Sequence, residues 1–203
     1  MTDQKRPYRK KRRAELEAET RQRITESAIE LHGTLGPANT SISAVAEGAG
    51  VRRSTVYRHF PDEAALFAAC TSHWTTANPP PDIGSWAAIA SADVRLRRAL
   101  QELYGYYRRT ELMMENILRD EATMPIVGRM LGGYRTYLAS ARDTLMKGSD
   151  ARGGARRRMR AAVGHALAFP TWRSLAREEA LSDRQAADLM CRMVAAASGP
   201  GKR

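Results

Sequence analysis

The sequence lacks the long apolar runs and paired cysteines that mark membrane-spanning and disulfide-stabilised chains. No run of about 18 or more apolar residues is present, so we expect no transmembrane helix. The basic N-terminus is not followed by an apolar stretch, which argues against a secretory signal. Cys70 and Cys191 lie far apart in apolar helical patterns, and we interpret them as buried thiols rather than a disulfide or a metal site. These absences favour a globular protein of the cytoplasm.

Signatures of several enzyme classes are also missing. The chain has no H-E-x-x-H zinc motif, no glycine-rich phosphate loop and no nucleophile elbow. The acidic pairs Asp120-Glu121 and Glu178-Glu179 are adjacent in sequence, so their carboxylates would project apart on a helix. We therefore expect no catalytic residues, no cofactor and no metal, and an enzyme on a helical scaffold is a remote alternative.

Alternation of apolar and polar residues at period two is absent as well, so we expect an all-α fold without a sheet. Breakers such as Gly36-Pro37 and the triple proline at 79–81 divide the chain. The expected helices span about 14–35, 42–48, 53–59, 62–74, 86–91, 93–109, 111–119, 125–146, 155–178 and 183–197. Pro170 should kink the helix over 155–178, and Ser182 with Gln185 forms a capping box for the last helix.

The segment from Thr40 to Leu66 has the pattern of two short helices joined by a glycine turn, with a third helix following at once. Ser41 precedes an apolar periodic run and is expected to cap the first of these helices. Gly48 and Gly50 bracket the turn. The second helix is short, basic on one side and carries small polar side chains, which suits insertion into a DNA major groove.

This segment closely resembles the DNA-binding domain of TetR-family transcriptional regulators. The likeness covers AVAEGAGV at the turn, STVYRHF in the second helix, PDEAALF after it, and TRQRITESAIELHGTLGP upstream. A weaker likeness continues through HALAFPTWRSLA and LSDRQAADLM near the C-terminus. The resemblance implies a three-helix helix-turn-helix DNA-binding domain at 14–74, followed at 75–203 by a helical domain that binds a ligand and dimerises.

Residues on and near the second short helix are expected to contact DNA. Arg53 can donate two hydrogen bonds to O6 and N7 of a guanine, and the short side chains of Ser54 and Thr55 allow close approach. By resemblance, Tyr57 and His59 bond backbone phosphates, although packing and helix capping are the plainer interpretations. The candidate DNA contacts in this domain are Ser41, Ser43, Arg52, Arg53, Ser54, Thr55, Tyr57 and His59.

Three positions depart from the family pattern. Arg52 stands where a capping serine or aspartate is usual, so it cannot cap the helix but adds a cation. Glu63 stands where the family usually has a lysine that contacts phosphate, so that contact is lost. Ala44 replaces an acidic residue that often completes the capping box of the preceding helix. Other arginines and a basic tail would have to offset these losses.

The net charge of +11 is concentrated at the N-terminus. Residues 1–13 carry seven lysines and arginines against the single Asp3. We expect 1–13 to be a disordered, solvated tail in the free protein. Beside a helix-turn-helix, such a tail can bind phosphates or enter a minor groove, and its candidate contacts are Arg6, Arg9 and Arg12. Attachment to a membrane surface is the weaker alternative, because apolar anchors are absent.

The region between 86 and 172 is rich in large, adaptable side chains that resemble the lining of an apolar pocket. For any one of them, an ordinary core position is the plainer interpretation. His165, Phe169 and Trp172 share one face of a helix and could close a pocket or shape a dimer seam. The candidate ligand-binding residues are Trp86, Tyr104, Tyr107, Met114, Met124, Tyr134, His165, Phe169 and Trp172.

The last helix has an apolar face for which a second copy of the chain is the expected partner. By resemblance, the final two helices form a four-helix bundle with those of a second copy, and the candidate interface residues are Leu189, Met190, Met193 and Val194. A dimer would also let two recognition helices read a palindromic operator.

The sequence thus predicts a homodimeric regulator that binds double-stranded DNA, most simply a repressor released by a small apolar or aromatic effector. Control by a protein partner, or by no ligand, stays open. No membrane partner is expected.

Overall fold

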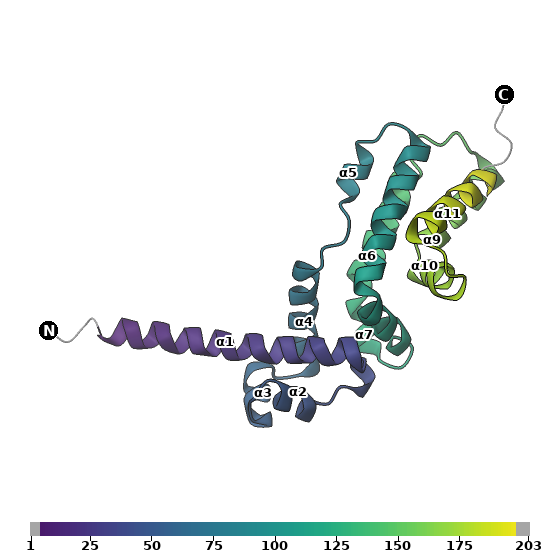
Figure 1. Cartoon of the computed structure of the whole chain (residues 1–203). Coiled ribbons are helices and arrows are strands. Elements are labelled where there is room, and N and C mark those ends of the chain that lie inside the picture. Colours follow the sequence, from purple (N-terminus) through teal and green to yellow (C-terminus); the bar gives the residue numbers. More distant parts are fainter. Residues whose placement is uncertain (1–4, 198–203) are drawn as a thin grey trace. The chain divides into compact units, whose positions relative to one another are not determined.

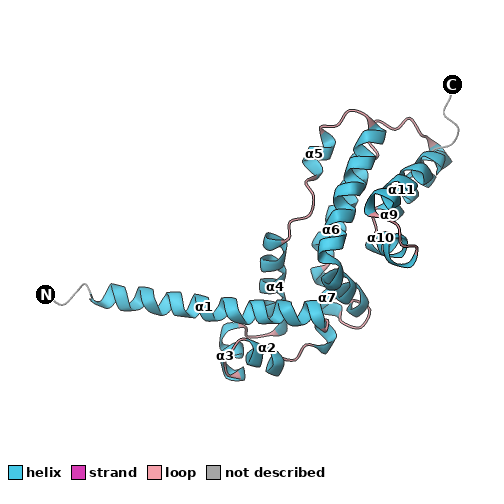
Figure 2. Ribbon diagram, in the orientation of Figure 1, coloured by secondary structure: helices cyan, strands magenta, loops and turns pink. Residues whose placement is uncertain are grey.

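The computed structural model describes the backbone of residues 5–197 and the side chains from Tyr8 onward. Across that range the chain forms helices and no strands, as Figures 1 and 2 show. The chain divides into two compact units. The first unit contains the described residues up to Asn78 together with Leu112–Met130, and the second contains Pro79–Glu111 and the described residues from Leu131. The all-α prediction, with an N-terminal helix-turn-helix followed by further helices, is confirmed.

The first unit holds the helix-turn-helix. Its elements are α1 (Lys5–Thr34), the short 3-10 helix η1 (Pro37–Asn39), α2 (Ile42–Gly48), α3 (Arg53–His59), α4 (Glu63–Ala77), α7 (Pro125–Met130) and the end of α6 (Ala92–Asp120). α1 and α4 enclose α2 and α3 around one apolar core. Ile24, Val45, Val56 and Phe60 are each at most 1% exposed in that core. Burying these side chains is what holds the short α2 and α3 in place, because helices of seven residues are not stable alone.

The long helix α1 begins at Lys5, not near Ala14, so the described part of the predicted tail, from residue 5 onward, is helical in this structure. Lysine, arginine, alanine and glutamate are strong helix formers, and residues 8–32 contain no proline or glycine. Pro7 lies in the first turn, where a missing backbone donor costs nothing. α1 ends at Thr34, shortly before Gly36, whose φ of 91° favours glycine.

Local sequence signals located the following three helices well. α2 and α3 have the predicted bounds, and the Oγ of Ser41 accepts a hydrogen bond from the Ala44 amide at 3.1 Å. Asp62 caps α4 through a 2.7 Å hydrogen bond from the Ala65 amide. α4 runs three residues beyond the predicted end and stops at Ala77, next to the triple proline.

The second unit is built from short helices around the first part of α6. They are α5 (Ile83–Ala87), α8 (Gly132–Leu145), α9 (Gly153–Ala166), α10 (Phe169–Arg173), the π-helical turn η2 (Ser174–Glu178) and α11 (Asp183–Ala197). α11 packs along α9, and α8 contacts both α5 and α9. The predicted capping box of α11 is confirmed, because Gln185 accepts from the Ser182 amide at 2.9 Å.

Several helix boundaries after α4 differ from the prediction. The helices expected at 93–109 and 111–119 form one helix, α6, because Thr110 stays helical and bonds its hydroxyl to the Tyr106 carbonyl. The helix expected at 125–146 is interrupted at Leu131, next to the flexible pair Gly132-Gly133. α5 begins earlier than expected, because Asp82 caps it by accepting from two backbone amides.

The helix expected at 155–178 is also broken, at residues 167–168, with Pro170 at the start of a new helix. A proline is favourable in the first turn of a helix, so the chain turns before Pro170 and does not bend around it. The π-helical turn η2 follows α10 directly. The expected kink is therefore a complete break between α9 and α10.

Candidate nucleic-acid interface

The turn between α2 and α3 is fixed by glycine and by close packing on α1. Gly50 has a φ of 64°, a conformation that suits glycine, and the Val51 amide returns a 2.9 Å hydrogen bond to the Ala46 carbonyl. A Cβ at Gly48 would collide with the hydroxyl of Ser27 on α1. The two glycines predicted to bracket the turn are therefore needed for different reasons. Gly50 adopts a positive φ, and Gly48 allows α1 to pack closely on α2.

Two arginines of α1 bind the C-terminal ends of α2 and α3. Arg21 donates a 2.6 Å hydrogen bond to the carbonyl of His59, the last residue of α3, and its guanidinium lies 4.1 Å from the ring centroid of Phe60. Arg23 donates at 3.1 Å to the carbonyl of Ala49, which caps α2. Cations at helix C-termini are favourable, because they neutralise unpaired carbonyls and the helix dipole. Sequence reasoning missed both contacts.

The face of α3 opposite the core is exposed and basic. Val56 points into the core at 1% exposure, whereas Arg52, Arg53, Ser54 and Arg58 are exposed. Ser41 and Ser43, at the start of α2, are exposed as well, and Thr55 is half-buried. Exposed basic and small polar groups thus occupy the surface that a major groove would receive.

Arg53 and Tyr57 form a pair on this exposed face. Arg53 Nη2 donates a 3.1 Å hydrogen bond to the hydroxyl of Tyr57, and its guanidinium lies 5.6 Å from the tyrosine ring centroid. The two residues are four positions apart, so they meet on one side of α3. Arg53 is therefore held against a ring and does not extend freely into solvent.

His59 ends α3 in a half-buried position. Burial lowers the pKa of its imidazole, and the nearby positive charges of Arg58 and Arg21 lower it further against a smaller effect of Glu17. Its Nε2 atom is buried and has no hydrogen-bond partner within the part of the chain that the structure describes. The imidazole is consequently neutral near pH 7 and keeps an unused polar atom.

The basic part of α1 is an exposed helix. Arg9 and Arg12 are exposed, as are all residues from Tyr8 to Glu19, and Arg13 pairs with Glu17 at 3.1 Å. The side chain of Arg6 lies outside the described residues. In this structure Arg9 and Arg12 are therefore side chains of a helix.

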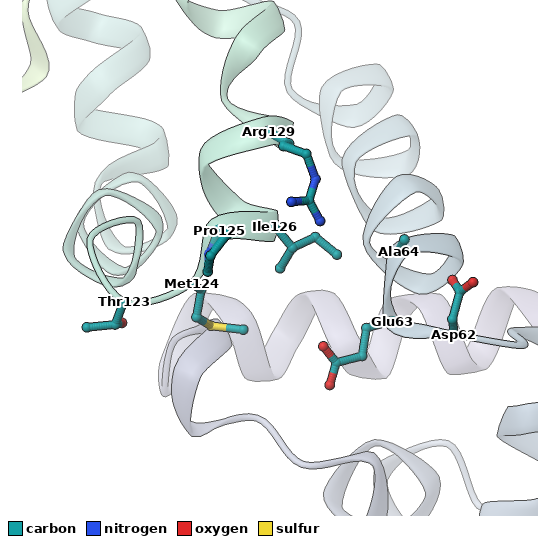
Figure 3. Close-up of a pocket in the computed structure, with 8 residues that line it drawn as sticks. All are labelled: Asp62, Glu63, Ala64, Thr123, Met124, Pro125, Ile126 and Arg129. Carbon is teal, nitrogen blue, oxygen red and sulfur yellow. The ribbon is translucent and has the colours of Figure 1, made fainter.

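A shallow groove in the first unit was not predicted from the sequence. Its volume is about 640 Å³, and Figure 3 shows its lining of Asp62, Glu63 and Ala64 from the start of α4 and Thr123, Met124, Pro125, Ile126 and Arg129 from α7 and the residues before it. Glu63, at the position where a phosphate-binding lysine was expected, is one of its walls. Met124, predicted to bind a ligand, lines this groove of the first unit.

The other ligand-binding predictions fall in two places. Met114 is buried at the end of α6 in the first unit. The remaining seven, in the second unit, are Trp86, Tyr104, Tyr107, Tyr134, His165, Phe169 and Trp172. His165 is exposed and lies 3.3 Å from the Thr171 hydroxyl, whereas Trp86 is fully buried on α5 and donates to Glu102 at 2.6 Å.

An aromatic cluster forms where α6 meets α10. Tyr107 packs edge-on against Phe169, with ring centroids 5.4 Å apart, and Phe169 lies 5.5 Å from Trp172. Tyr104 and Tyr107 are fully buried, with centroids 6.4 Å apart. Four of the predicted ligand-binding residues, Tyr104, Tyr107, Phe169 and Trp172, therefore lie together in a packed part of the core.

The tyrosine hydroxyls of this cluster are satisfied by the protein. Tyr104 donates to the Ala166 carbonyl at 2.9 Å, and Tyr107 donates to the Leu167 carbonyl at 2.6 Å and contacts the Tyr134 hydroxyl at 2.9 Å. Burial raises the pKa of Tyr134 to about 12. These tyrosines are therefore neutral donors that close the break between α9 and α10.

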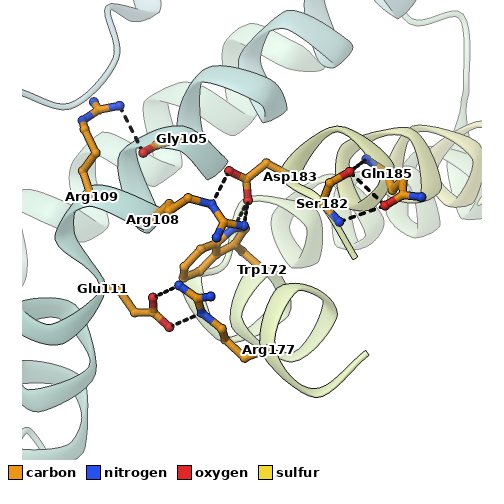
Figure 4. A network of polar contacts seen from close by, with 9 residues as sticks. All are labelled: Gly105, Arg108, Arg109, Glu111, Trp172, Arg177, Ser182, Asp183 and Gln185. Carbon is orange, nitrogen blue, oxygen red and sulfur yellow. Dashed lines mark hydrogen bonds and ion pairs between the residues drawn. The ribbon is translucent and has the colours of Figure 1, made fainter. Parts of the chain in front are cut away.

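A network of ion pairs covers Trp172, as Figure 4 shows. Arg108 binds Asp183 with two 2.7 Å hydrogen bonds, and the indole of Trp172 donates to the same carboxylate at 2.8 Å. Burial alone would raise the pKa of Asp183, but the hydrogen bonds from Arg108 and Trp172 hold it below its usual value.

Arg177 completes the network from η2. It binds Glu111 with both nitrogens of its fork, and both Arg108 and Arg177 lie 5.8 Å from the Trp172 ring centroid. The arginines thus tie α6 to the π-helical turn and to α11. Partners that lie 66 and 75 positions apart leave no local sequence signal.

The predicted dimer residues also separate by exposure. Met190 and Val194 are each 2% exposed and belong to the core of their own chain, whereas Met193 is 49% exposed and Leu189 is half-buried. Of the four, Leu189 and Met193 are the ones that remain accessible to a partner.

Comparison with known proteins assigns the helix-turn-helix segment. The sequence profile described as bacterial regulatory proteins, tetR family, matches residues 24–70. These residues therefore form a DNA-binding domain of the TetR type. A 50-residue stretch is 42% identical to the HTH-type transcriptional regulator AcrR of Shigella flexneri, and it spans 25% of this chain and 23% of AcrR.

Solved structures share the whole TetR-type fold. A chain described as a TetR-family transcriptional regulator from Mesorhizobium loti aligns over 89% of this chain and 96% of its own, with a TM-score of 0.62 at 19% identity. A chain described as a fatty acid metabolism regulator from Clostridium perfringens aligns over 89% of this chain and 100% of its own, with a TM-score of 0.63 at 12% identity. Among residues 5–197, no helix is long and apolar enough to cross a membrane.

Proposed function

We propose that this chain is a transcriptional repressor that acts in the bacterial cytosol by binding a palindromic DNA operator as a homodimer. The observation that carries the proposal is the exposed basic face of α3, held from behind by Val56 and from its end by Arg21. Nothing in the fold of α3 itself requires Arg52, Arg53 and Arg58 on that face. Such a concentration of cations is favourable next to phosphates, whereas without an anion the like charges repel one another.

Arg53 is the proposed base-reading residue. Its stacking on Tyr57 removes part of the side-chain freedom that a bidentate contact with guanine would otherwise have to restrict. His59 and Tyr57, with Ser41 and Ser43, are the proposed phosphate contacts. Tyr57, Ser41 and Ser43 are exposed, and His59 is half-buried at the end of α3.

The proposed dimer uses the exposed faces of α9 and α11. α11 buries Met190 and Val194 against its own chain but leaves Met193 on the outside, next to the half-buried Leu189. Two copies are needed because one recognition helix contacts only a few base pairs, and half-sites separated by about 34–36 Å match two-fold symmetry.

The proposed effector is a small apolar or aromatic molecule that enters the second unit near Tyr107, Phe169 and Trp172. The cluster is packed in the present conformation, so a ligand would have to open the cover formed by Arg108, Arg177 and the π-helical turn. π-helical turns are frequent at functional sites, which supports this segment as the moving part. Release of DNA through this opening would make the chain a ligand-responsive repressor.

Binding of labelled random-sequence duplexes, measured by fluorescence anisotropy, tests the DNA-binding part of the proposal. Arg58→Glu should weaken binding strongly, because it reverses a charge on the exposed face of α3. Arg129→Glu makes the same charge change in the same unit but away from α3, and should have little effect. Equal losses for the two variants would show that only net charge matters and would contradict a DNA site on α3.

Screening small aromatic and fatty compounds for release of bound DNA tests the effector. A true effector should lower DNA affinity and change Trp172 fluorescence at the same concentration. A protein-controlled or ligand-free regulator, the second possibility, would keep its DNA in the presence of every compound.

A further inference from the structure

We propose that the basic N-terminal part of α1, residues 5–13, forms its helix on DNA, so that folding of this segment and DNA binding are one coupled step. This inference rests on the proposed function and goes beyond it, because it assigns a conformational change to a segment that would otherwise be a simple charged arm. In the structure this segment is helical, and we assign that conformation to the DNA-bound state.

From Tyr8 onward, where its side chains are described, the segment has no tertiary support. All residues from Tyr8 to Glu19 are exposed, with Tyr8 at 67% and Leu16 at 55%. The first contact that ties α1 to another helix of the helix-turn-helix is made by Arg21. As an extension of a helix that is already formed, the segment gains only the small free energy of helix propagation, so a modest penalty can unfold it.

Charge opposes the helix in the absence of an anion. Residues 5–13 hold seven cations, and Arg9 has Arg12 and Arg13 three and four positions further on, where they face it. The first turn of α1 contains no acidic residue, so the positive end of the helix dipole meets positive side chains. One ion pair, from Arg13 to Glu17, supports the described part of the segment.

An array of phosphates removes these penalties. Neutralising the cations abolishes the repulsion between neighbouring turns, and the intrinsic preference of lysine and arginine for helix then prevails. The partner must therefore be a polyanion of extended shape. The segment itself points to DNA as that partner, because it is continuous with the helix that holds the recognition helix.

The position of the segment fits duplex DNA that extends past the operator. α1 crosses the end of α3 at Arg21, and its N-terminal part continues beyond α2 and α3 (Figure 1). At about 1.5 Å per residue, the seven cations lie roughly 12 to 24 Å along the helix from that crossing. Flanking phosphates would thus be contacted outside the bases that α3 reads.

Two full-length variants separate charge from helix formation. Ala14→Pro keeps all seven cations but prevents helix N-terminal to residue 14, while a proline at the start of a helix leaves 14–34 intact. The double variant Arg9→Gln/Arg12→Gln removes two charges but keeps good helix formers.

Circular dichroism and anisotropy with a 30-base-pair random-sequence duplex provide the test. The wild type should gain helical signal on adding DNA, and Ala14→Pro should not. Ala14→Pro should also bind the duplex about tenfold more weakly or worse, since binding then lacks the ordered segment. The glutamine variant should keep the helical gain at saturation while its salt slope falls by up to about 2.

Wild-type affinity in Ala14→Pro, or no gain of helix in the wild type, would overturn the proposal, because the segment would then be a flexible arm or a permanent helix. Failure of the proposed function gives a different result, namely no duplex binding by any of the three proteins.

Discussion

The side-chain amide of Asn116, on α6, donates hydrogen bonds to the backbone carbonyl of Gly33 at 2.8 Å, near the end of α1. It also donates to the adjacent carbonyl of His32 at 3.2 Å. Carbonyls in the last turn of a helix have no partner within the helix, so α6 supplies the cap that α1 lacks. Asn116 is 7% exposed, which leaves little room for water to replace it.

Two neighbours extend this cap around the bend after α1. Asp120 accepts from the Ala38 amide at 2.9 Å, and Arg119 donates to the Leu35 carbonyl at 3.1 Å. A Cβ at Gly36 would collide with both side chains. The earlier part of the same helix, α6, carries Tyr104 and Tyr107 of the aromatic cluster, so α6 contributes residues to both units.

Removing the amide should destabilise the chain. Asn116→Ala leaves two buried carbonyls unsatisfied, and we expect a loss of about 1–3 kcal/mol in the free energy of unfolding. Urea denaturation measures it as a lower midpoint at unchanged slope. Gln22→Ala, which removes only an exposed contact with Glu26, is the matched control and should change little. Equal midpoints for the two variants would contradict the capping role.

Stability should fall in mild acid because of His32. This residue is 5% exposed, stacks on Phe67 at 4.8 Å, and has a pKa lowered by burial from 6.5 to about 4, against a smaller opposite effect of Asp120. In the unfolded chain the His32 imidazole takes up a proton below pH 6.5, whereas in the folded chain it does so only below about pH 4. The stabilisation by neutral His32 is therefore complete above pH 6.5 and is lost as the pH falls to 4. The loss in the free energy of unfolding is on the order of 3 kcal/mol.

His32→Gln should flatten the dependence of unfolding free energy on pH between 4 and 6.5, as measured by urea titrations at several pH values. The exposed His73→Gln is the control. An unchanged pH dependence in His32→Gln would show that other groups cause the acid sensitivity.

Base reading should depend on Arg53 and overall affinity on His59. Arg53→Ala is expected to relax preference at one base pair of each half-site, by about 1–3 kcal/mol, because it removes a bidentate contact. His59→Ala should weaken binding to all sequences alike. Competition assays against single-base operator variants distinguish the two patterns. A uniform loss in Arg53→Ala would make Arg53 a phosphate contact.

Dimerisation should require the outer face of α11. Met193→Lys places a charge on an apolar residue that is 49% exposed, so it should yield monomers and weak DNA binding without unfolding the chain. Sedimentation velocity measures the result. Val94→Lys makes the same change at a residue 56% exposed elsewhere in the second unit, and should stay dimeric. A dimeric Met193→Lys protein would move the interface away from this face.

Local signals predicted the helix-turn-helix in detail. Ser41, Asp62 and Ser182 cap the helices that follow them, because a capping residue needs only its own next few amides. Boundaries without such a signal were misplaced, as at Thr110, where a β-branched residue stays within a helix. The start of α1 was also misplaced, because charge alone does not decide between helix and disorder.

Long-range contacts were beyond sequence reasoning. Aromatic residues at helical spacing indicated the cluster around Tyr107 and Trp172, but not that it is packed shut. The pairing of Arg108 with Asp183 depends on how α6 and α11 meet, which no pattern within either helix records. Exposure of Met193 beside the buried Met190 likewise required the packing of α11 on α9.

Selection of bound fragments from a random duplex pool tests the central claim most directly. A dimeric TetR-family repressor should enrich a palindrome whose half-sites lie about one or two DNA turns apart, and Arg53→Ala should enrich the same palindrome with one position per half-site relaxed. Enrichment of no sequence over the starting pool, or of single half-sites without symmetry, would contradict operator binding by a dimer.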